Sequence, residues 1–184
     1  LDANIWMPST DLNQGKKFLA GYEVTRLATL LRALGIDAIS YNHKNDDNLL
    51  RLAEMESRVI LTRDKNLARR LTRCAIYHLP YDHVKDQVRD VFKHFGLVRQ
   101  KDAFLSRCSR CNSKGFEGPL GRSEIRAIML NGTVSERIVE KTEEFWVCVN
   151  EKCRKIFWSG PKSKQAMSTI DDIFMGMNDS CFEE

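Results

Sequence analysis

Two pairs of closely spaced cysteines constrain this chain more than any other feature of its sequence. Cys108 and Cys111 are separated by two residues, and Cys148 and Cys153 by four. Pairs with this spacing are typical of structural zinc sites, in which four thiolates surround one ion. The 36 residues between the pairs exceed the usual spacing, so we expect hairpin or helix to fill the gap. We predict a structural zinc ion, because four thiolates leave no position for a catalytic water.

An α/β domain is predicted before the cysteines. Apolar residues recur at three- and four-residue steps from Val24 to Leu34, which is typical of an amphipathic helix, and Gly35 marks its end. Short apolar segments at 36–41, 59–62 and 75–79 then alternate with helical patterns. This alternation predicts a parallel sheet covered by helices on both faces. The expected units are an α/β domain over 1–100, a zinc-ribbon module over 101–162 and an acidic segment with a possible short helix over 163–184.

The first 21 residues do not show a clear period. Leu1–Asn4 is expected to end the first strand, and the Pro- and Gly-containing segment 5–21 to be a loop. Its apolar side chains, and those of the C-terminal helix, either pack on the core or contact a protein partner. The candidate partner-binding residues are Trp6, Phe18, Ile173 and Phe174.

Acidic residues follow the expected strands. Asp2 ends the first, Asp46 and Asp47 follow the second, and Asp64 follows the third. Because the carboxyl ends of parallel strands meet at one edge of a sheet, these carboxylates could converge. They could then hold Mg²⁺ or Mn²⁺ and activate a water for phosphodiester cleavage. Alternatively, Asp47 and Asp64 are N-caps of the helices that follow them.

Charge is distributed unevenly along the chain. All 29 Lys and Arg residues precede residue 165, whereas the last 20 residues contain five acids. A basic body favours binding to a polyanion, although the same residues could be an ordinary solvated surface. No apolar stretch is long enough to span a membrane. The candidate RNA-binding residues are Arg58, Arg63, Lys65, Arg69, Arg70, Arg73, Arg107, Arg110, Lys114, Arg154 and Lys155.

The motifs LATLLRALGIDA, DDNLLRLAE, RVILTRDKNLARRL, RCSRCN and EFWVCVNEKC occur in this order, preceded by LDAN. In this order they resemble the Mutator-seven C-terminal family, described as a PIN-like α/β domain with a zinc ribbon. The resemblance implies that Asp2, either Asp46 or Asp47, and Asp64 match the acids of a PIN-like nuclease, and that the four cysteines match the ribbon ligands. It also implies that 5–21 is an insertion relative to compact members, and that the second cysteine pair is wider spaced than theirs.

In animals, the family is appended to 3′–5′ exoribonucleases of small-RNA silencing. The resemblance therefore implies an accessory domain that holds single-stranded RNA for an attached exoribonuclease and docks a protein partner that localises it. The alternative is a metal-dependent PIN-like endoribonuclease. In the first case catalysis occurs elsewhere in the parent chain. A cytoplasmic or nuclear location, in RNA granules, is implied by the family alone.

Overall fold

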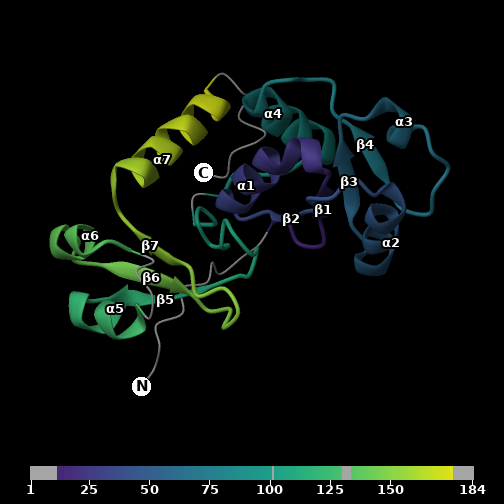
Figure 1. The fold of residues 1–184 in the computed structure, drawn as a ribbon. Helices are drawn as coiled ribbons and strands as arrows, with labels where there is room; N and C mark the ends of the chain where they lie inside the picture. The colour runs from purple at the N-terminus through teal and green to yellow at the C-terminus, as the bar shows by residue number, and fades with distance from the viewer. Residues whose placement is uncertain (1–11, 101, 130–133, 176–184) are drawn as a thin grey trace.

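A parallel four-stranded sheet forms the centre of the larger of two units in this chain. The computed structural model describes residues 12–100, 102–129 and 134–175 (Figure 1). The strand order is β2-β1-β3-β4, with every neighbouring pair parallel. The strands are β1 (Lys17–Ala20), β2 (Asp37–Ser40), β3 (Val59–Thr62) and β4 (Ile76–His78).

Helices cover both faces of this sheet, as the alternating pattern predicted. A 3-10 turn (Tyr22–Val24) leads into α1 (Thr25–Ala33), which packs with α4 (Val84–Phe95) on one face. On the other face, α2 (Asp46–Glu56) and α3 (Lys65–Ala68) bury a smaller cluster against β1 and β3. The prediction of an α/β fold is confirmed. The helix that follows β1 and the helix that follows β3 lie on opposite faces of the sheet.

The first described strand of the sheet lies within the segment that the sequence pattern assigned to a loop. Residues 17–20 form β1, the strand between β2 and β3, and Phe18 is only 1% exposed in the core. The interpretation of this part of 5–21 as an inserted loop is therefore wrong, and Phe18 is a core residue. Leu1–Asn4, with Asp2 and Trp6, lies outside the described residues.

Gly35 ends α1 in a conformation that requires glycine. Its φ is +81°, and a Cβ added to it would lie 2.6 Å from the carbonyl oxygen of Ala103. Gly96 ends α4 with φ +55°, but a Cβ there would meet no atom within 4 Å.

These two glycines form a matched pair for a stability test. Gly96→Ala is expected to cost about 1–2 kcal/mol, the penalty of the left-handed conformation alone. Gly35→Ala adds a collision with the backbone, which is expected to destabilise the protein by about a further 1–3 kcal/mol. Denaturant unfolding of both variants measures the difference. Equal losses would show that the approach of Ala103 to Gly35 does not constrain the fold.

The smaller unit is an antiparallel three-stranded sheet, which we call the ribbon. Its strands are β5 (Phe116–Leu120), β6 (Phe145–Cys148) and β7 (Ile156–Trp158), in that order. Two short helices, α5 (Arg122–Ile128) and α6 (Glu136–Lys141), occupy the long gap between the cysteine pairs and share a small apolar core with the sheet. The expected filling of that gap by regular structure is confirmed.

Helix α7 (Pro161–Phe174) returns from the ribbon to pack on α4 (Figure 1). Ile173 and Phe174 are buried, and the rings of Phe174 and Phe92 lie 4.9 Å apart in an edge-to-face arrangement. These two residues are therefore core residues rather than free anchors for a partner. No helix in the described part of the chain is long and apolar enough to cross a membrane.

Candidate metal centre and basic cleft

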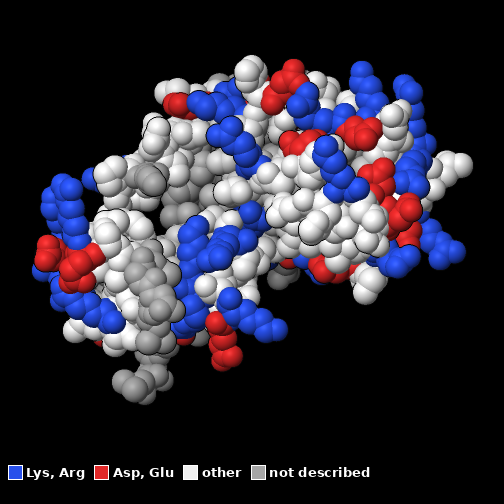
Figure 2. Space-filling model, in the orientation of Figure 1, with Lys and Arg blue, Asp and Glu red and all other residues white. Residues whose placement is uncertain are grey.

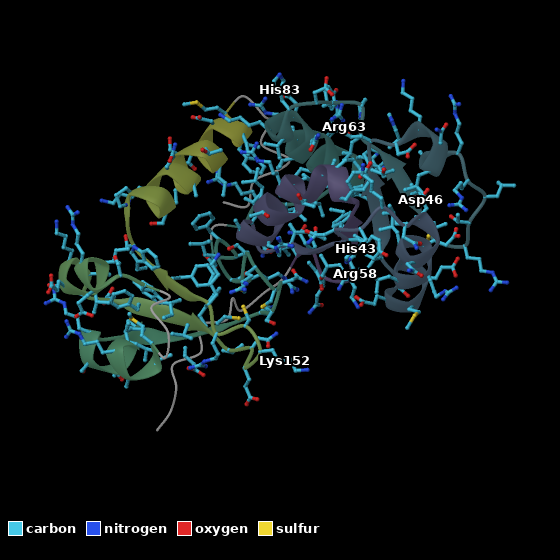
Figure 3. All side chains as sticks on the ribbon, viewed as in Figure 1. His43, Asp46, Arg58, Arg63, His83 and Lys152 are labelled. Carbon is cyan, nitrogen blue, oxygen red and sulfur yellow. The ribbon has the colours of Figure 1, made fainter. Side chains whose placement is uncertain are left out.

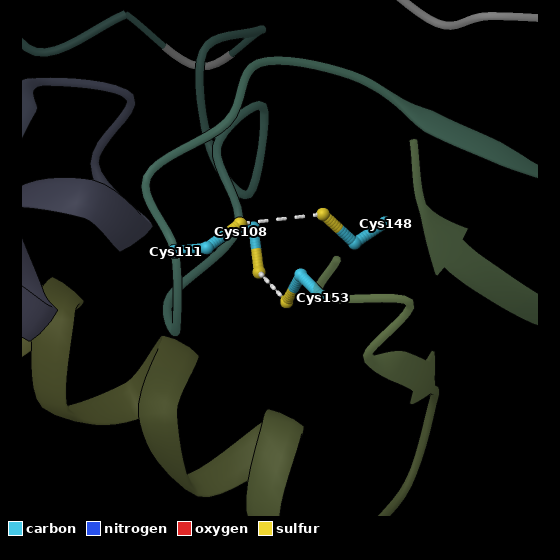
Figure 4. A group of neighbouring side chains, drawn as sticks. All are labelled: Cys108, Cys111, Cys148 and Cys153. Atoms are coloured by element: carbon cyan, nitrogen blue, oxygen red, sulfur yellow. Dashed lines mark hydrogen bonds between the residues drawn. The ribbon is translucent and has the colours of Figure 1, made fainter. Parts of the chain in front are cut away.

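The four predicted cysteine ligands converge at the end of the ribbon that faces the α/β unit (Figure 4). All four sulfur atoms lie within 4.8 Å of one another. Cys108 Sγ is 3.8 Å from Cys153 Sγ, and Cys111 Sγ is 3.5 Å from Cys148 Sγ. A tetrahedral zinc with Zn–S bonds of about 2.3 Å requires sulfur separations of about 3.8 Å. The cluster therefore has the geometry to hold a metal ion such as zinc.

Hydrogen bonds to the sulfur atoms favour their thiolate form, which is the form that binds a metal ion. Backbone N–H groups of Arg110 and Cys111 donate to Cys108, and that of Asn150 donates to Cys148. Burial raises the pKa of both of these thiols. Burial acts in the same direction on Cys111, but hydrogen bonds from Ser113 and the neighbouring thiols outweigh it and lower the Cys111 pKa to about 6. A bound divalent cation would favour the thiolate form of all four groups against the effect of burial.

The first cysteine knuckle, residues 107–114, is bound to the edge of the parallel sheet. Asn112 donates from Nδ2 to Asp37 Oδ1 at 2.8 Å and accepts from the backbone N–H of Ala38 at 3.2 Å. Because β2 is an edge strand, this side chain satisfies a donor that would otherwise be unpaired. Arg32 of α1 donates to the carbonyl oxygen of Ser109 at 3.0 Å. The cysteine cluster is thus attached to the α/β unit by polar contacts of the buried side chains Asn112 and Arg32.

Asp37 connects this knuckle with the sheet. Its carboxylate accepts from Arg58 Nη1 at 2.5 Å and lies 3.6 Å from Arg107 Nη2. Burial alone would raise the Asp37 pKa, but the hydrogen bonds from Arg58 and Asn112 and the charge of Arg107 lower it below its usual value. Arg58 and Arg107 were predicted to bind RNA. The structure places both inside this network, where they have structural contacts instead.

The carboxyl edge of the sheet contains an acid that the sequence pattern missed. After β1 and β3, which are neighbouring strands, the chain turns to opposite faces of the sheet. Open α/β sheets form a crevice between the carboxyl ends of two such strands. Glu23, just after β1, accepts from the hydroxyl of Thr62 at 2.5 Å and from the backbone N–H of Arg63 at 3.0 Å. Its carboxylate therefore bridges the two strand ends. The local signal for Glu23 was the segment KFLA before Gly21, which by itself is too short to distinguish a strand from a loop.

The predicted acids have other contacts in the described structure. Asp64 caps α3, accepting from the backbone N–H groups of Asn66 and Leu67. Asp46 and Asp47 lie in the first turn of α2, and Arg70 contacts both, at 3.5 and 2.9 Å. Among the described residues, the four cysteines are the only group of three or more potential ligands close enough to hold a metal. Asp2, the fourth predicted acid, lies outside these residues.

Two of the predicted RNA-binding arginines near α3 are paired with acids. Arg63 pairs with Asp82, and Arg70 with the two acids of α2. Figure 3 shows Asp46 and Arg63 on the α/β unit, away from Lys152 in the turn between β6 and β7. On the ribbon, Arg154 pairs with Glu117 at 2.8 Å. The predicted residues Lys65, Arg69 and Arg73 are exposed.

An open cleft of about 600 Å³ separates the first knuckle from α1 and β2, and we call it the junction cleft. Its described lining contains no Asp or Glu, and its cations are Arg26, Arg32, Arg110 and Lys155. Figure 2 shows Lys and Arg side chains grouped in the middle of the displayed face, where the two units meet, and mixed with acids over α2 and α3. Lys114 lines a second, smaller cleft of about 250 Å³.

Comparison with known proteins places this fold in a family. A family model described as the Mut7-C RNAse domain matches residues 16–170, beginning one residue before β1. No curated protein and no solved structure matches the chain. The match covers the parallel sheet, the ribbon and all four cysteines. The resemblance inferred from the sequence is confirmed at this level, and the chain belongs to the Mut7-C RNAse domain family.

Proposed function

We propose that this domain binds RNA, with a zinc ion in the cysteine cluster, as an accessory to a 3′–5′ exoribonuclease. The observation that carries the proposal is the junction cleft, in which four cations and no described acid line one opening beside the metal centre. Phosphate groups bind such surfaces through a salt-dependent electrostatic interaction. An RNA-binding role also agrees with membership of an RNase-type family.

Zinc supports this role by fixing the first knuckle. Four thiolates saturate a tetrahedral zinc, so the ion would supply structure rather than an activated water. Four thiolates and one Zn²⁺ carry a net charge of about −2. Arg32 is buried beside the cluster, and the charges of Cys108 and Cys111 raise its pKa against the larger lowering effect of burial. Arg32 would therefore offset the charge of the zinc–thiolate centre.

A metal-dependent endoribonuclease is the second candidate. The family description and the position of Glu23 and Asp64 at the carboxyl edge favour it. Against it, Glu23 is held by Thr62 and Arg63, and the predicted acids of α2 contact Arg70. The docking of a localising protein partner stays a prediction for Trp6.

One experiment separates the two candidates. Labelled single-stranded RNA is incubated with the protein and Mn²⁺, and both binding and chain length are measured. We expect binding with a Kd of about 10⁻⁴–10⁻⁶ M near physiological salt, weakening steeply as salt rises, with the RNA intact. Cleavage that disappears in Asp64→Asn would support the endoribonuclease instead. The absence of binding at low salt would contradict the proposed function.

A further inference from the structure

The junction cleft contains two arginines that are free to contact a ligand. Arg26 projects from α1 and Arg110 from the first knuckle, and both are exposed. Within the described part of the chain, neither forms an ion pair. Arg63 and Arg70 on the α3 side, by contrast, each contact a carboxylate. A phosphate that binds in the cleft does not have to displace an internal acid.

Two other cations hold the cleft in shape. Arg32 donates to the backbone oxygens of Ser109 and Ala38 at 3.0 Å each, and to Thr29 Oγ1 at 3.1 Å. Lys155 donates to Ser109 Oγ at 3.1 Å, and its Nζ lies 4.8 Å from the centre of the Phe157 ring. These contacts fix positive charge in the floor and wall of the cleft. The site is therefore organised before a ligand arrives, which lowers the entropy cost of binding.

Three aromatic residues are close in sequence to residues that line the cleft, just after the carboxyl ends of β1 and β2. Asn42 lines the cleft, and its neighbours Tyr41 and His43 have ring centres 5.5 Å apart. In the 3-10 turn after β1, Tyr22 is 46% exposed, and Lys44 Nζ lies 5.2 Å from its ring centre. A cationic groove followed by exposed rings is the arrangement that binds single-stranded nucleic acid, because phosphates contact the cations and bases stack on the rings.

The size of the cleft favours a single strand over a duplex. Its volume of about 600 Å³ is that of a site for a small molecule or a few nucleotides. Duplex RNA is recognised instead across successive grooves, over roughly 16 base pairs. Thr25 and Asn42 add neutral hydrogen-bonding groups to the lining, which suit ribose 2′-hydroxyls.

We propose that single-stranded RNA lies in the junction cleft, with phosphates on Arg26 and Arg110 and a base stacked on the exposed face of Tyr22. This inference rests on the proposed RNA-binding function and assigns it a site. The strand passes from the metal centre, along the outer edge of β2, to the carboxyl edge of the sheet. The zinc knuckle and the α/β unit each supply one wall, so neither unit alone contains the complete site.

Fluorescence anisotropy with a labelled single-stranded RNA of about 12 nucleotides tests this site. The double variant Arg26→Glu, Arg110→Glu is expected to lower affinity more than tenfold at about 50 mM salt. The slope of log affinity against log salt should fall by about 1.4, because two phosphate contacts are lost at about 0.7 each. Tyr22→Ala should lower affinity about five- to hundredfold through lost stacking.

The matched control is Arg51→Glu, Arg137→Glu, which makes the same charge change at one exposed arginine in each unit, away from the cleft. It should change affinity less than about threefold. An equal loss of affinity in the control would overturn the assignment of RNA to the junction cleft. A larger loss of affinity in Arg69→Glu, Arg73→Glu would also overturn it, because it would place RNA on the α3 side. Circular dichroism should show all these exposed-site variants folded.

Competition separates failure of the site from failure of the function. Unlabelled single-stranded RNA should compete better than duplex RNA of the same length, and equal competition would overturn the single-strand assignment. Single-stranded DNA should compete less well, because it lacks the 2′-hydroxyl. If the wild-type protein binds RNA and the cleft variant binds equally, only the site is wrong. If the wild-type protein binds no RNA, both the site and the proposed function are wrong.

Discussion

Cys148→Ser is expected to abolish stoichiometric zinc binding and to unfold the ribbon. Cys148 is fully buried at the end of β6, and its sulfur lies 3.5 Å from that of Cys111. Zinc binding at a structural site contributes an apparent free energy of about 10–16 kcal/mol to folding. This is as large as the total stability of an average domain. The ribbon's own apolar clusters are small, so they are not expected to replace this contribution. Metal analysis should give about one zinc per wild-type chain and much less in the variant.

Cys74→Ser is the matched control for this variant. Cys74 is half-buried in the α/β unit, and its sulfur contacts Thr72 rather than the cluster. Zinc content and the melting of the ribbon should therefore be unchanged. Retention of one zinc and of wild-type melting by Cys148→Ser would contradict the assignment of the cysteines as a metal centre.

Asp37→Asn is expected to destabilise the protein by about 3 kcal/mol at neutral pH, because it leaves two arginines without their shared carboxylate. Arg58 is 8% and Asp37 19% exposed, so water compensates little for the lost charge. For a chain of this length, a loss of this size lowers the melting temperature by about 6–12 °C. Asp82→Asn is the control. Asp82 is 77% exposed beside Arg63, and such surface pairs contribute at most about 1 kcal/mol.

The pH dependence of the Asp37→Asn effect has a definite sign. The folded-state pKa of Asp37 lies below its unfolded value, so its stabilising contribution is complete above the unfolded pKa of about 3.9. That contribution disappears as the pH falls through the lower, folded-state pKa. The stability difference between wild type and Asp37→Asn should therefore be constant from pH 7 to about 5 and shrink below about 4. A difference that grows on acidification would contradict the charged role of Asp37.

Local patterns in the sequence were sufficient for the four-cysteine cluster and most of the sheet. Cysteine spacing within each pair is a property of a few residues, so it could identify Cys108 and its partners without knowledge of the rest of the fold. The apolar period of α1 and the glycine at position 35 likewise act locally. The parallel sheet followed from the alternation of these elements, because such sheets need helices on both faces.

The first strand and the acid beside it could not be found in this way. The strand KFLA has four residues and follows a Pro- and Gly-containing segment, so its pattern was too short to separate from loop. Its place between β2 and β3 depends on pairing with residues 37–40 and 59–61, which are distant in sequence. Because residues 17–20 were interpreted as part of a loop, Glu23 just after them was not among the predicted acids.

The roles of the arginines were also beyond local reasoning. Arg58 belongs to a basic run in the sequence, yet its partner Asp37 is 21 residues away, and Asn112 joins the same carboxylate from 75 residues away. Whether an arginine is free or paired is decided by tertiary contacts. Arg26 and Arg32, which the sequence did not single out, line the junction cleft because α1 faces the first knuckle.

The most direct test compares the RNA affinity of Cys148→Ser with that of Cys74→Ser. It tests the claim that the first knuckle, held in place by a metal ion, completes the RNA site. Far-UV circular dichroism should retain most of its helical signal in both variants, because α1 to α4 belong to the α/β unit, which has its own core. We predict that Cys148→Ser loses zinc and at least tenfold in affinity for single-stranded RNA, whereas Cys74→Ser keeps both. Undiminished RNA affinity in a zinc-free Cys148→Ser protein would contradict the account and confine the ribbon to another role.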